Sequence, residues 1–212
     1  MAVPKIKICG ITAAREVQWL NENKVDYAGF VFFEKSKRNL TMPQAKALLD
    51  GLDQTVRPVA VTVSPTVALV EEIQKNGFAI LQVHGILSEE VKAVCRLPIW
   101  RAFNVEQMTE LVSEREGFQE SEKIDAFLID NAQYGSGQTF DWSKLDADVL
   151  REIRTKKLIL AGGLNASNIA EGIAIFQPDI VDVSSGVEKE NGIGKDEEKI
   201  TEFVRKVRER HE

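Results

Sequence analysis

The sequence contains few of the residues on which several classes of protein depend. Its 212 residues include two cysteines, Cys9 and Cys95, and two histidines, one of them near the C-terminus. The cysteines are far apart and both lie in apolar runs, so the chain has neither a disulfide framework nor the ligand spacing of a zinc site. We therefore expect no bound metal and a reducing, cytosolic compartment.

Positive charge and long apolar runs are also scarce. Lysine and arginine total 27 against 33 acidic residues, a net charge of −6, whereas a nucleic-acid-binding protein normally presents a basic face. No segment approaches the roughly 20 apolar residues that span a bilayer, and Met1–Lys7 has no apolar stretch long enough for a signal peptide. We expect a cytoplasmic protein whose partners include neither nucleic acid nor a membrane.

What the sequence does contain is a regular alternation of short apolar runs and helical patterns. Most apolar runs are rich in Val, Ile and Phe and have no polar face, which is typical of parallel strands covered on both sides. The expected strands are Lys5–Gly10, Tyr27–Phe33, Val56–Val63, Ile80–Gly85, Ile99–Val105, Ala126–Asp130, Lys157–Gly163 and Ile180–Gly186. Capping residues predict helix starts at Thr12, Thr41, Ser64-Pro65, Ser88, Asn165-Ala166-Ser167 and Lys195-Asp196.

Eight strand-then-helix units in a chain of this length predict an α/β fold, the (β/α)8 TIM barrel. A doubly wound open sheet is the alternative, but it more often has five or six strands and a glycine fingerprint after the first one. The segment Lys7–Thr12 is no such fingerprint. Because no linker or low-complexity stretch interrupts the pattern, we expect a single barrel domain over residues 1–212.

Reactive side chains gather where the expected strands end. In such barrels the active site is built from the C-terminal ends of the strands and the loops that follow them. The residues at these positions are Cys9, Ser36-Lys37-Arg38, Gln82, His84, Arg101, Asp130, Gly162-Gly163 and Ser184-Ser185-Gly186. They include a thiol, a carboxylate, a cationic loop and two turns of small residues.

Two of these residues are candidates for acid–base chemistry. Cys9 is either a buried, inert thiol or, at a strand end facing helix N-termini, a thiol of lowered pKa that acts as a base or nucleophile. Asp130 is either a cap for the next segment or a catalytic acid or base. Because the loop Tyr134–Gly137 follows it rather than a helix, the sequence favours the catalytic role.

The other candidates are typical of anion recognition. Gly162-Gly163 and Ser184-Ser185-Gly186 follow the last two strands, where barrels often bind a phosphorylated small molecule through backbone N–H groups. A glycine pair alone is equally typical of a plain turn. Arg38 is either solvated surface charge or a clamp for a carboxylate. His84 is either a structural hydrogen-bonding residue or a substrate contact.

Seven motifs occur in order over most of the chain. They are Lys7–Thr12, Gly29–Phe32 with Ser36–Arg38, Gln82–Gly85, Asp130 with Gly135–Trp142, Leu160–Leu164, Val181–Glu188 and Gly194–Asp196. Together they resemble the motifs of the phosphoribosylanthranilate isomerase family. Three positions depart from the family pattern, because Tyr134 replaces a glycine and Gln138 and Arg101 stand where lysine is common.

The resemblance implies an Amadori rearrangement in tryptophan biosynthesis, from N-(5′-phosphoribosyl)anthranilate to 1-(2-carboxyphenylamino)-1-deoxyribulose 5-phosphate, without a cofactor. It implies Asp130 as general acid and Cys9 as general base. The implied substrate-binding residues are Arg38, Gln82, His84, Gly162, Gly163, Ser184, Ser185 and Gly186. The rivals are a barrel isomerase for the histidine-pathway aminoaldose and a barrel that only binds its ligand. The sequence leaves open whether the protein is a monomer or a homodimer.

Overall fold

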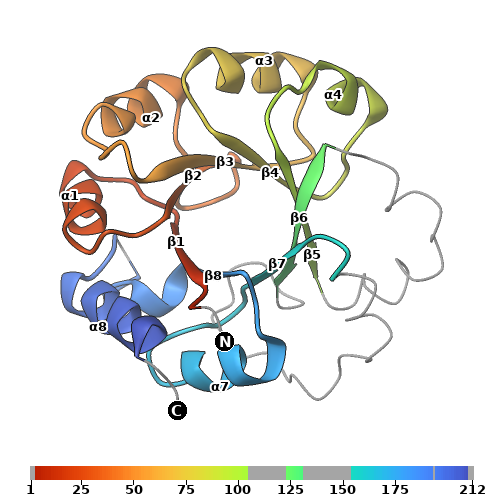
Figure 1. The fold of residues 1–212 in the computed structure, drawn as a ribbon. Helices are drawn as coiled ribbons and strands as arrows, with labels where there is room; N and C mark the ends of the chain where they lie inside the picture. Colours follow the sequence, from red (N-terminus) through yellow and green to blue (C-terminus); the bar gives the residue numbers. More distant parts are fainter. Residues whose placement is uncertain (1–2, 105–122, 131–153, 193, 210–212) are drawn as a thin grey trace.

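A closed barrel of eight parallel strands forms the centre of the computed structural model, with helices outside it (Figure 1). The structure describes residues 3–104, 123–130, 154–192 and 194–209. The strands are β1 (Lys5–Cys9), β2 (Tyr27–Phe32), β3 (Arg57–Val63), β4 (Ile80–His84), β5 (Ile99–Asn104), β6 (Ile124–Asp130), β7 (Lys157–Leu160) and β8 (Ile180–Val183). The predicted (β/α)8 TIM barrel is confirmed.

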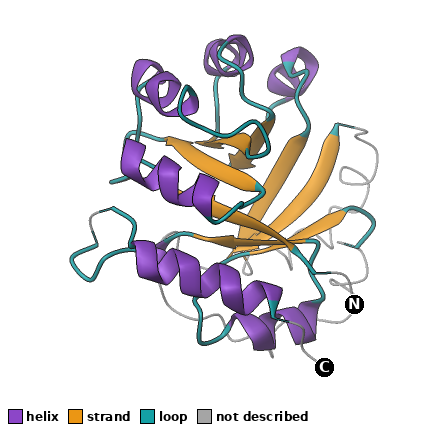
Figure 2. Ribbon diagram, turned by 60° about the vertical axis from the view of Figure 1, so that its left-hand side comes forward, coloured by secondary structure: helices purple, strands orange, loops and turns teal. Residues whose placement is uncertain are grey.

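Helices flank the strands on the outside of the ring, as Figure 2 shows from the side. In the described ranges they are α1 (Ala14–Glu22), α2 (Met42–Leu49), α3 (Val67–Lys75), α4 (Glu89–Val94), α7 (Ile169–Phe176) and α8 (Glu197–Arg208), with a short 3₁₀ turn, η2 (Ser185–Val187). None of the helices in the described part of the chain is long and apolar enough to cross a membrane.

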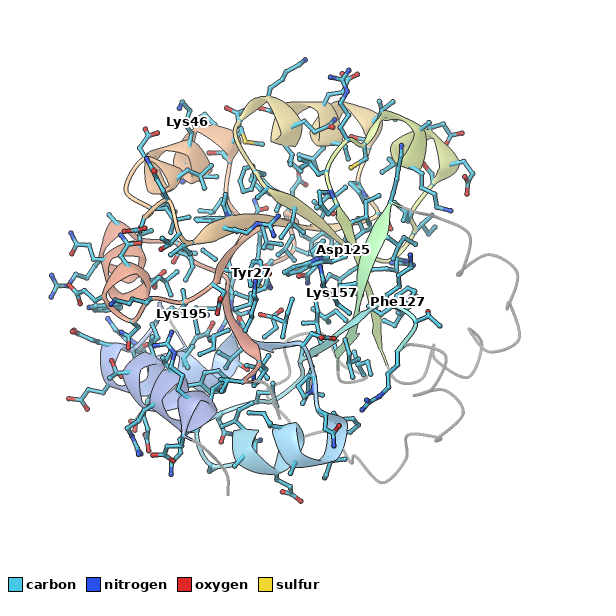
Figure 3. The ribbon with its side chains drawn as sticks, in the orientation of Figure 1. Tyr27, Lys46, Asp125, Phe127, Lys157 and Lys195 are labelled. Atoms are coloured by element: carbon cyan, nitrogen blue, oxygen red, sulfur yellow. The ribbon has the colours of Figure 1, made fainter. Side chains whose placement is uncertain are left out.

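The core has two layers because strand residues alternate between the two faces of the barrel wall. The larger layer fills the space between strands and helices, and a smaller layer fills the barrel interior. In the interior, Tyr27 and Trp100 meet edge to face with ring centroids 4.9 Å apart. Figure 3 shows Tyr27 within the ring and Lys46 on the outer helix α2. Burial on both faces explains the continuously apolar strand sequences.

Several strands end earlier than predicted because a glycine leaves the extended conformation. Gly10, Gly85, Gly162 and Gly163 have φ values of 80°, 68°, 85° and 65°, which a side chain rarely permits. Strands β1, β4 and β7 therefore stop before these glycines, and β8 stops at Val183. The shorter strands leave glycine and serine turns at one end of the barrel.

Three predicted helix caps are confirmed, at Thr41, Ser88 and Asp196, whose side chains accept hydrogen bonds from backbone N–H groups of the first turn. The prediction for Thr12 was wrong. Ala13 occupies the cap position, and the Glu16 carboxylate accepts the backbone N–H groups of Thr12 and Ala13 at 2.7 and 3.2 Å. A side chain of the first turn thus satisfies these donors instead of the cap residue.

Two further helix starts were also wrong by a few residues. Thr66 caps α3, while Ser64 has a φ of 47° and its Oγ accepts the Ile86 N–H at 2.9 Å. Asn165 forms a turn in which its side chain accepts the Ser167 N–H at 2.8 Å, and α7 begins only at Ile169. In both cases the polar side chain stabilises the loop before the helix.

Candidate active site

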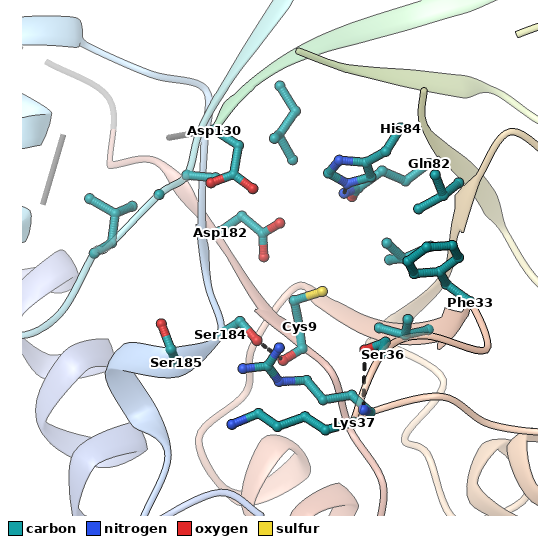
Figure 4. Close-up of a pocket in the computed structure, with 18 of the residues that line it drawn as sticks. Cys9, Phe33, Ser36, Lys37, Gln82, His84, Asp130, Asp182, Ser184 and Ser185 are labelled. Atoms are coloured by element: carbon teal, nitrogen blue, oxygen red, sulfur yellow. Dashed lines mark hydrogen bonds between the residues drawn. The ribbon is translucent and has the colours of Figure 1, made fainter. Parts of the chain in front are cut away.

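A cavity of about 530 Å³ opens at the C-terminal ends of the strands. All but one of the residues predicted to be catalytic or substrate-binding line it, and they come from six strands or the loops after them (Figure 4). These residues are Cys9, Arg38, Gln82, His84, Asp130, Gly162, Gly163, Ser184 and Ser185. Gly186 is absent from this lining, and the loop Tyr134–Trp142 lies outside the described residues.

Cys9 is the last residue of β1, and its thiol points into this cavity (Figure 4). Gly29 lies opposite it on β2, where a Cβ atom would come within 2.9 Å of the Cys9 sulfur. The Ser184 hydroxyl donates a hydrogen bond to the Cys9 carbonyl at 2.9 Å and ties β1 to the end of β8. Because Gly29 has no side chain, it leaves the space that the Cys9 thiol occupies.

The electrostatic surroundings of Cys9 correct the expectation of a lowered pKa. Burial raises the pKa of the Cys9 thiol, and the neighbouring Lys7 ammonium opposes this rise without cancelling it. Cys9 and Cys95 are both free thiols, and Cys95 is buried at the C-terminus of α4. Of the two, only Cys9 lies at the cavity.

Sequence analysis missed a buried ion pair directly below Cys9. The Lys7 Nζ lies 2.6 Å from Asp182 Oδ2, and the Lys7 side chain is 0% exposed. Lys7 and Asp182 are register partners on β1 and β8, the strands that close the barrel. The alternation of side chains along a strand could have revealed Lys7, because it is two residues before Cys9 and its side chain therefore points to the same face of β1.

Asp130 ends β6 and reaches the cavity half-buried, close to Asp182 in Figure 4. Asp182 also lines the cavity, and its Oδ1 is buried without a hydrogen-bond partner among the described residues. Burial raises the pKa of Asp182, although Lys7 favours its ionised form. Two carboxyl groups thus enter the site from β6 and β8, the strands on either side of β7.

Gln82 and His84 form the opposite wall of the cavity (Figure 4). Both are buried on β4, and Gln82 Nε2 lies 2.8 Å from His84 Nε2. Burial, together with the positive charges of Lys7 and Arg101, lowers the pKa of His84 to about 3. His84 is therefore a neutral imidazole at physiological pH and takes part only in uncharged hydrogen bonding.

Arg38 reaches the cavity from the loop after β2 and is held there by Glu188. Its Nε donates to Glu188 Oε1 at 2.5 Å, and the same carboxylate accepts from Lys37 at 2.9 Å and lies 3.4 Å from Lys195 Nζ. These cations outweigh burial and lower the pKa of Glu188 to about 2. Arg38 Nη2 is buried with no hydrogen-bond partner in the described ranges, so it is available to an anionic ligand.

The turns after β7 and β8 complete the rim. Gly162, Gly163, Ser184 and Ser185 line the cavity. Gly186 instead packs against the β7 turn, where a Cβ atom would lie 1.9 Å from the Leu164 carbonyl oxygen. Its role is to let the two turns approach each other. No group of three or more His, Cys, Asp or Glu side chains in the described part of the chain is arranged to hold a metal ion.

A closed (β/α)8 barrel with a thiol, two carboxyl groups and glycine turns around one cavity at the C-terminal strand ends has the architecture of a barrel enzyme. Residues 6–206 match the family model described as N-(5'phosphoribosyl)anthranilate (PRA) isomerase. The chain therefore belongs to the N-(5'-phosphoribosyl)anthranilate isomerase family.

Individual relatives agree with this assignment. The chain is 38% identical over 207 residues to the N-(5'-phosphoribosyl)anthranilate isomerase of Clostridium kluyveri, covering 96% of this chain and 98% of the relative. The crystal structure of the Thermotoga maritima enzyme superposes with a TM-score of 0.82 at 30% identity, covering 96% of this chain and 98% of that one. A further phosphoribosyl anthranilate isomerase structure, with a TM-score of 0.79 at 28% identity and the same coverage, contains reduced 1-(o-carboxyphenylamino)-1-deoxyribulose 5-phosphate.

Proposed function

We propose that the protein catalyses the Amadori rearrangement of N-(5′-phosphoribosyl)anthranilate in tryptophan biosynthesis, with Asp130 as general acid and Cys9 as general base. The observation that carries the proposal is that a carboxyl group from β6 and a thiol from β1 face one cavity large enough for a small phosphorylated molecule. The reaction needs one group to give a proton and another to take one. The family assignment supports the same reaction.

Each proton transfer has a defined bond change. Asp130 donates its proton to the ribose ring oxygen as the C1′–O bond breaks, and the anthranilate nitrogen forms a protonated Schiff base with C1′. The Cys9 thiolate then removes the proton from C2′, and the C–H electron pair forms the C1′–C2′ double bond of an enolamine. Tautomerisation gives the ketone. Positioned acid–base groups of this kind typically contribute about 10²–10⁴ in rate each.

The rest of the cavity suits the two anionic ends of this substrate. Arg38 offers its Nη2 to the anthranilate carboxylate while Glu188 holds Nε. The Gly162-Gly163 and Ser184-Ser185 turns offer closely approachable backbone to the phosphate. Gln82 and His84 contribute uncharged polar groups. We further propose a cytosolic enzyme, since both cysteines described are unpaired.

The test is the rate of loss of phosphoribosylanthranilate fluorescence in the wild type and in Cys9→Ala and Asp130→Asn. Each variant should lower kcat by at least about 10²-fold while folding is retained, because each removes one proton transfer. Cys95→Ala is the matched control and should keep nearly all activity, since Cys95 lies away from the cavity. Equal losses in Cys9→Ala and Cys95→Ala, or turnover only of the histidine-pathway aminoaldose, would contradict the proposal.

A further inference from the structure

A lysine ammonium group lies in the barrel interior, where the proposed reaction has assigned it no role. Lys7 is fully buried, although lysine is almost never fully buried unless it is paired. It precedes Cys9 by two residues on β1, so both side chains face the barrel interior. Its ammonium interacts both with Asp182 and with the Cys9 thiol. The interaction with Cys9 links this charge to the proposed base.

Stability alone gives no reason for this pair. A buried ion pair can often be replaced by packed apolar residues at no cost or with a gain in stability, because desolvating two charges is expensive. The Lys7–Asp182 pair also leaves Asp182 Oδ1 buried without a partner among the described residues, facing the cavity. Most other side chains of the barrel interior are apolar, and the nearby Gln82 and His84 are uncharged. The pair therefore calls for a functional explanation.

We propose that Lys7 is a positioning residue whose buried ammonium, held in place by Asp182, stabilises the thiolate of Cys9 and so makes this thiol usable as a base. The inference rests on the proposed role of Cys9. Burial disfavours a thiolate, while an adjacent cation favours it. Lys7 is the strongest influence that lowers the pKa of Cys9 against the effect of burial. Burial by itself would lower the pKa of Lys7, but Asp182, with a further contribution from Cys9, more than offsets it and raises this pKa, so Lys7 stays protonated.

The other charged and titratable groups at the cavity do not replace Lys7. Those that line the cavity are Asp182 on β8, Asp130 on β6, His84 on β4, and Lys35, Lys37 and Arg38 after β2. Next to Arg38, after β8, lie Glu188 and Lys195. Asp182 raises the pKa of Cys9, and the low pKa of His84 keeps that side chain neutral. Lys195 favours the thiolate less than Lys7 does, and its ammonium donates to the Ser184 carbonyl at 3.0 Å.

The experiment measures the pKa of Cys9 directly from the pH dependence of its alkylation by iodoacetamide, in a Cys95→Ala background. Two proteins are compared, the Cys95→Ala variant itself and the same variant with Lys7→Met/Asp182→Asn added, which removes both charges of the buried pair and leaves neither of them unpaired. Relative to Cys95→Ala alone, adding the double substitution should raise the pKa of Cys9 by about one unit, a tenfold loss of thiolate below that pKa, because Lys7 lowers this pKa more than Asp182 raises it.

Turnover gives a second readout. The acid limb of the kcat/KM profile should move to higher pH in the double variant, whereas a merely structural role for Lys7 would not move it. Equal Cys9 pKa values in the two folded variants would overturn the proposal. If the methionine variant does not fold, Lys7→Gln/Asp182→Asn makes the same comparison with a neutral polar side chain. Alkylation needs no substrate, so it can fail or succeed independently of the proposed isomerase reaction.

Discussion

At the scale of single residues, the sequence placed most of the site but not the electrostatics that govern it. Cys9, Asp130, His84 and Arg38 could be found because each ends or follows an apolar strand. Lys7 could not, because a lysine in an alternating strand reads as a solvent-facing residue until the barrel closes around it. The expectation of a lowered pKa for Cys9 failed for a similar reason, because burial of the thiol in the closed barrel raises its pKa.

The buried imidazole of His84 predicts a pH dependence of stability. Its pKa is about 3 in the folded protein, against an ordinary value of about 6.5, so between these values the unfolded chain binds a proton that the folded chain does not. Stability from this residue is therefore complete above pH 6.5 and falls as the pH drops towards 3. Between pH 6.5 and pH 5 the loss should be about 2 kcal/mol, at about 1.4 kcal/mol per pH unit.

Urea unfolding at pH 7 and pH 5 checks this expectation in the wild type and in His84→Gln. The variant should lose less stability between the two pH values, because glutamine does not titrate. Glu188 does not confound the comparison, since its folded pKa of about 2 and its unfolded value of about 4.5 both lie below pH 5. An identical pH dependence in the two proteins would show that His84 is not held neutral by the fold.

At the scale of elements, periodicity located all eight strands, and glycine conformation decided where they end. Gly162 and Gly163 lay inside a predicted strand, but their positive φ values turn the chain towards the cavity. A sequence shows that glycine permits such a turn without showing that the turn is made. Likewise, Ser64 and Asn165 are residue types that favour helix caps, but here their side chains accept hydrogen bonds from the backbone N–H groups of Ile86 and Ser167 in loops.

The pairing of Cys9 on β1 with Gly29 on β2 predicts how a methyl group added at Gly29 would affect activity. Gly29→Ala would place a Cβ atom 2.9 Å from the Cys9 sulfur and 3.0 Å from its Cα, so the thiol must shift. Since small displacements of a reacting group are costly, kcat should fall by roughly 10- to 100-fold with the barrel still folded. Gly51→Ala is the matched control, because its Cβ would meet only ordinary contacts at 3.7 Å, and it should keep full activity. Unchanged turnover in Gly29→Ala would mean that the thiol's position is not critical.

At the scale of the whole molecule, the fold was predictable because each unit carries the same simple signal. Parallel strands buried on both faces read as apolar runs, and counting them indicated a barrel. Closure itself has no local signal, since β1 pairs with β8 across almost the entire chain, with Lys7 opposite Asp182. The cavity depends on this closure, because the Ser184 hydroxyl bonds to the Cys9 carbonyl across the same seam.

Ligand binding at the cavity rim should therefore stabilise the barrel as a unit. Inorganic phosphate, a fragment of the proposed substrate, should bind at the Gly162-Gly163 and Ser184-Ser185 turns, which come from different strands. A ligand that binds only the folded chain raises the free energy of unfolding, by about 1.4 kcal/mol at ten times its Kd. Thermal unfolding in phosphate, with chloride of equal ionic strength as control, measures this effect. Phosphate should also inhibit turnover competitively, while a chelator should have no effect. Noncompetitive inhibition, or loss of activity with EDTA that a divalent ion restores, would contradict this reading of the site.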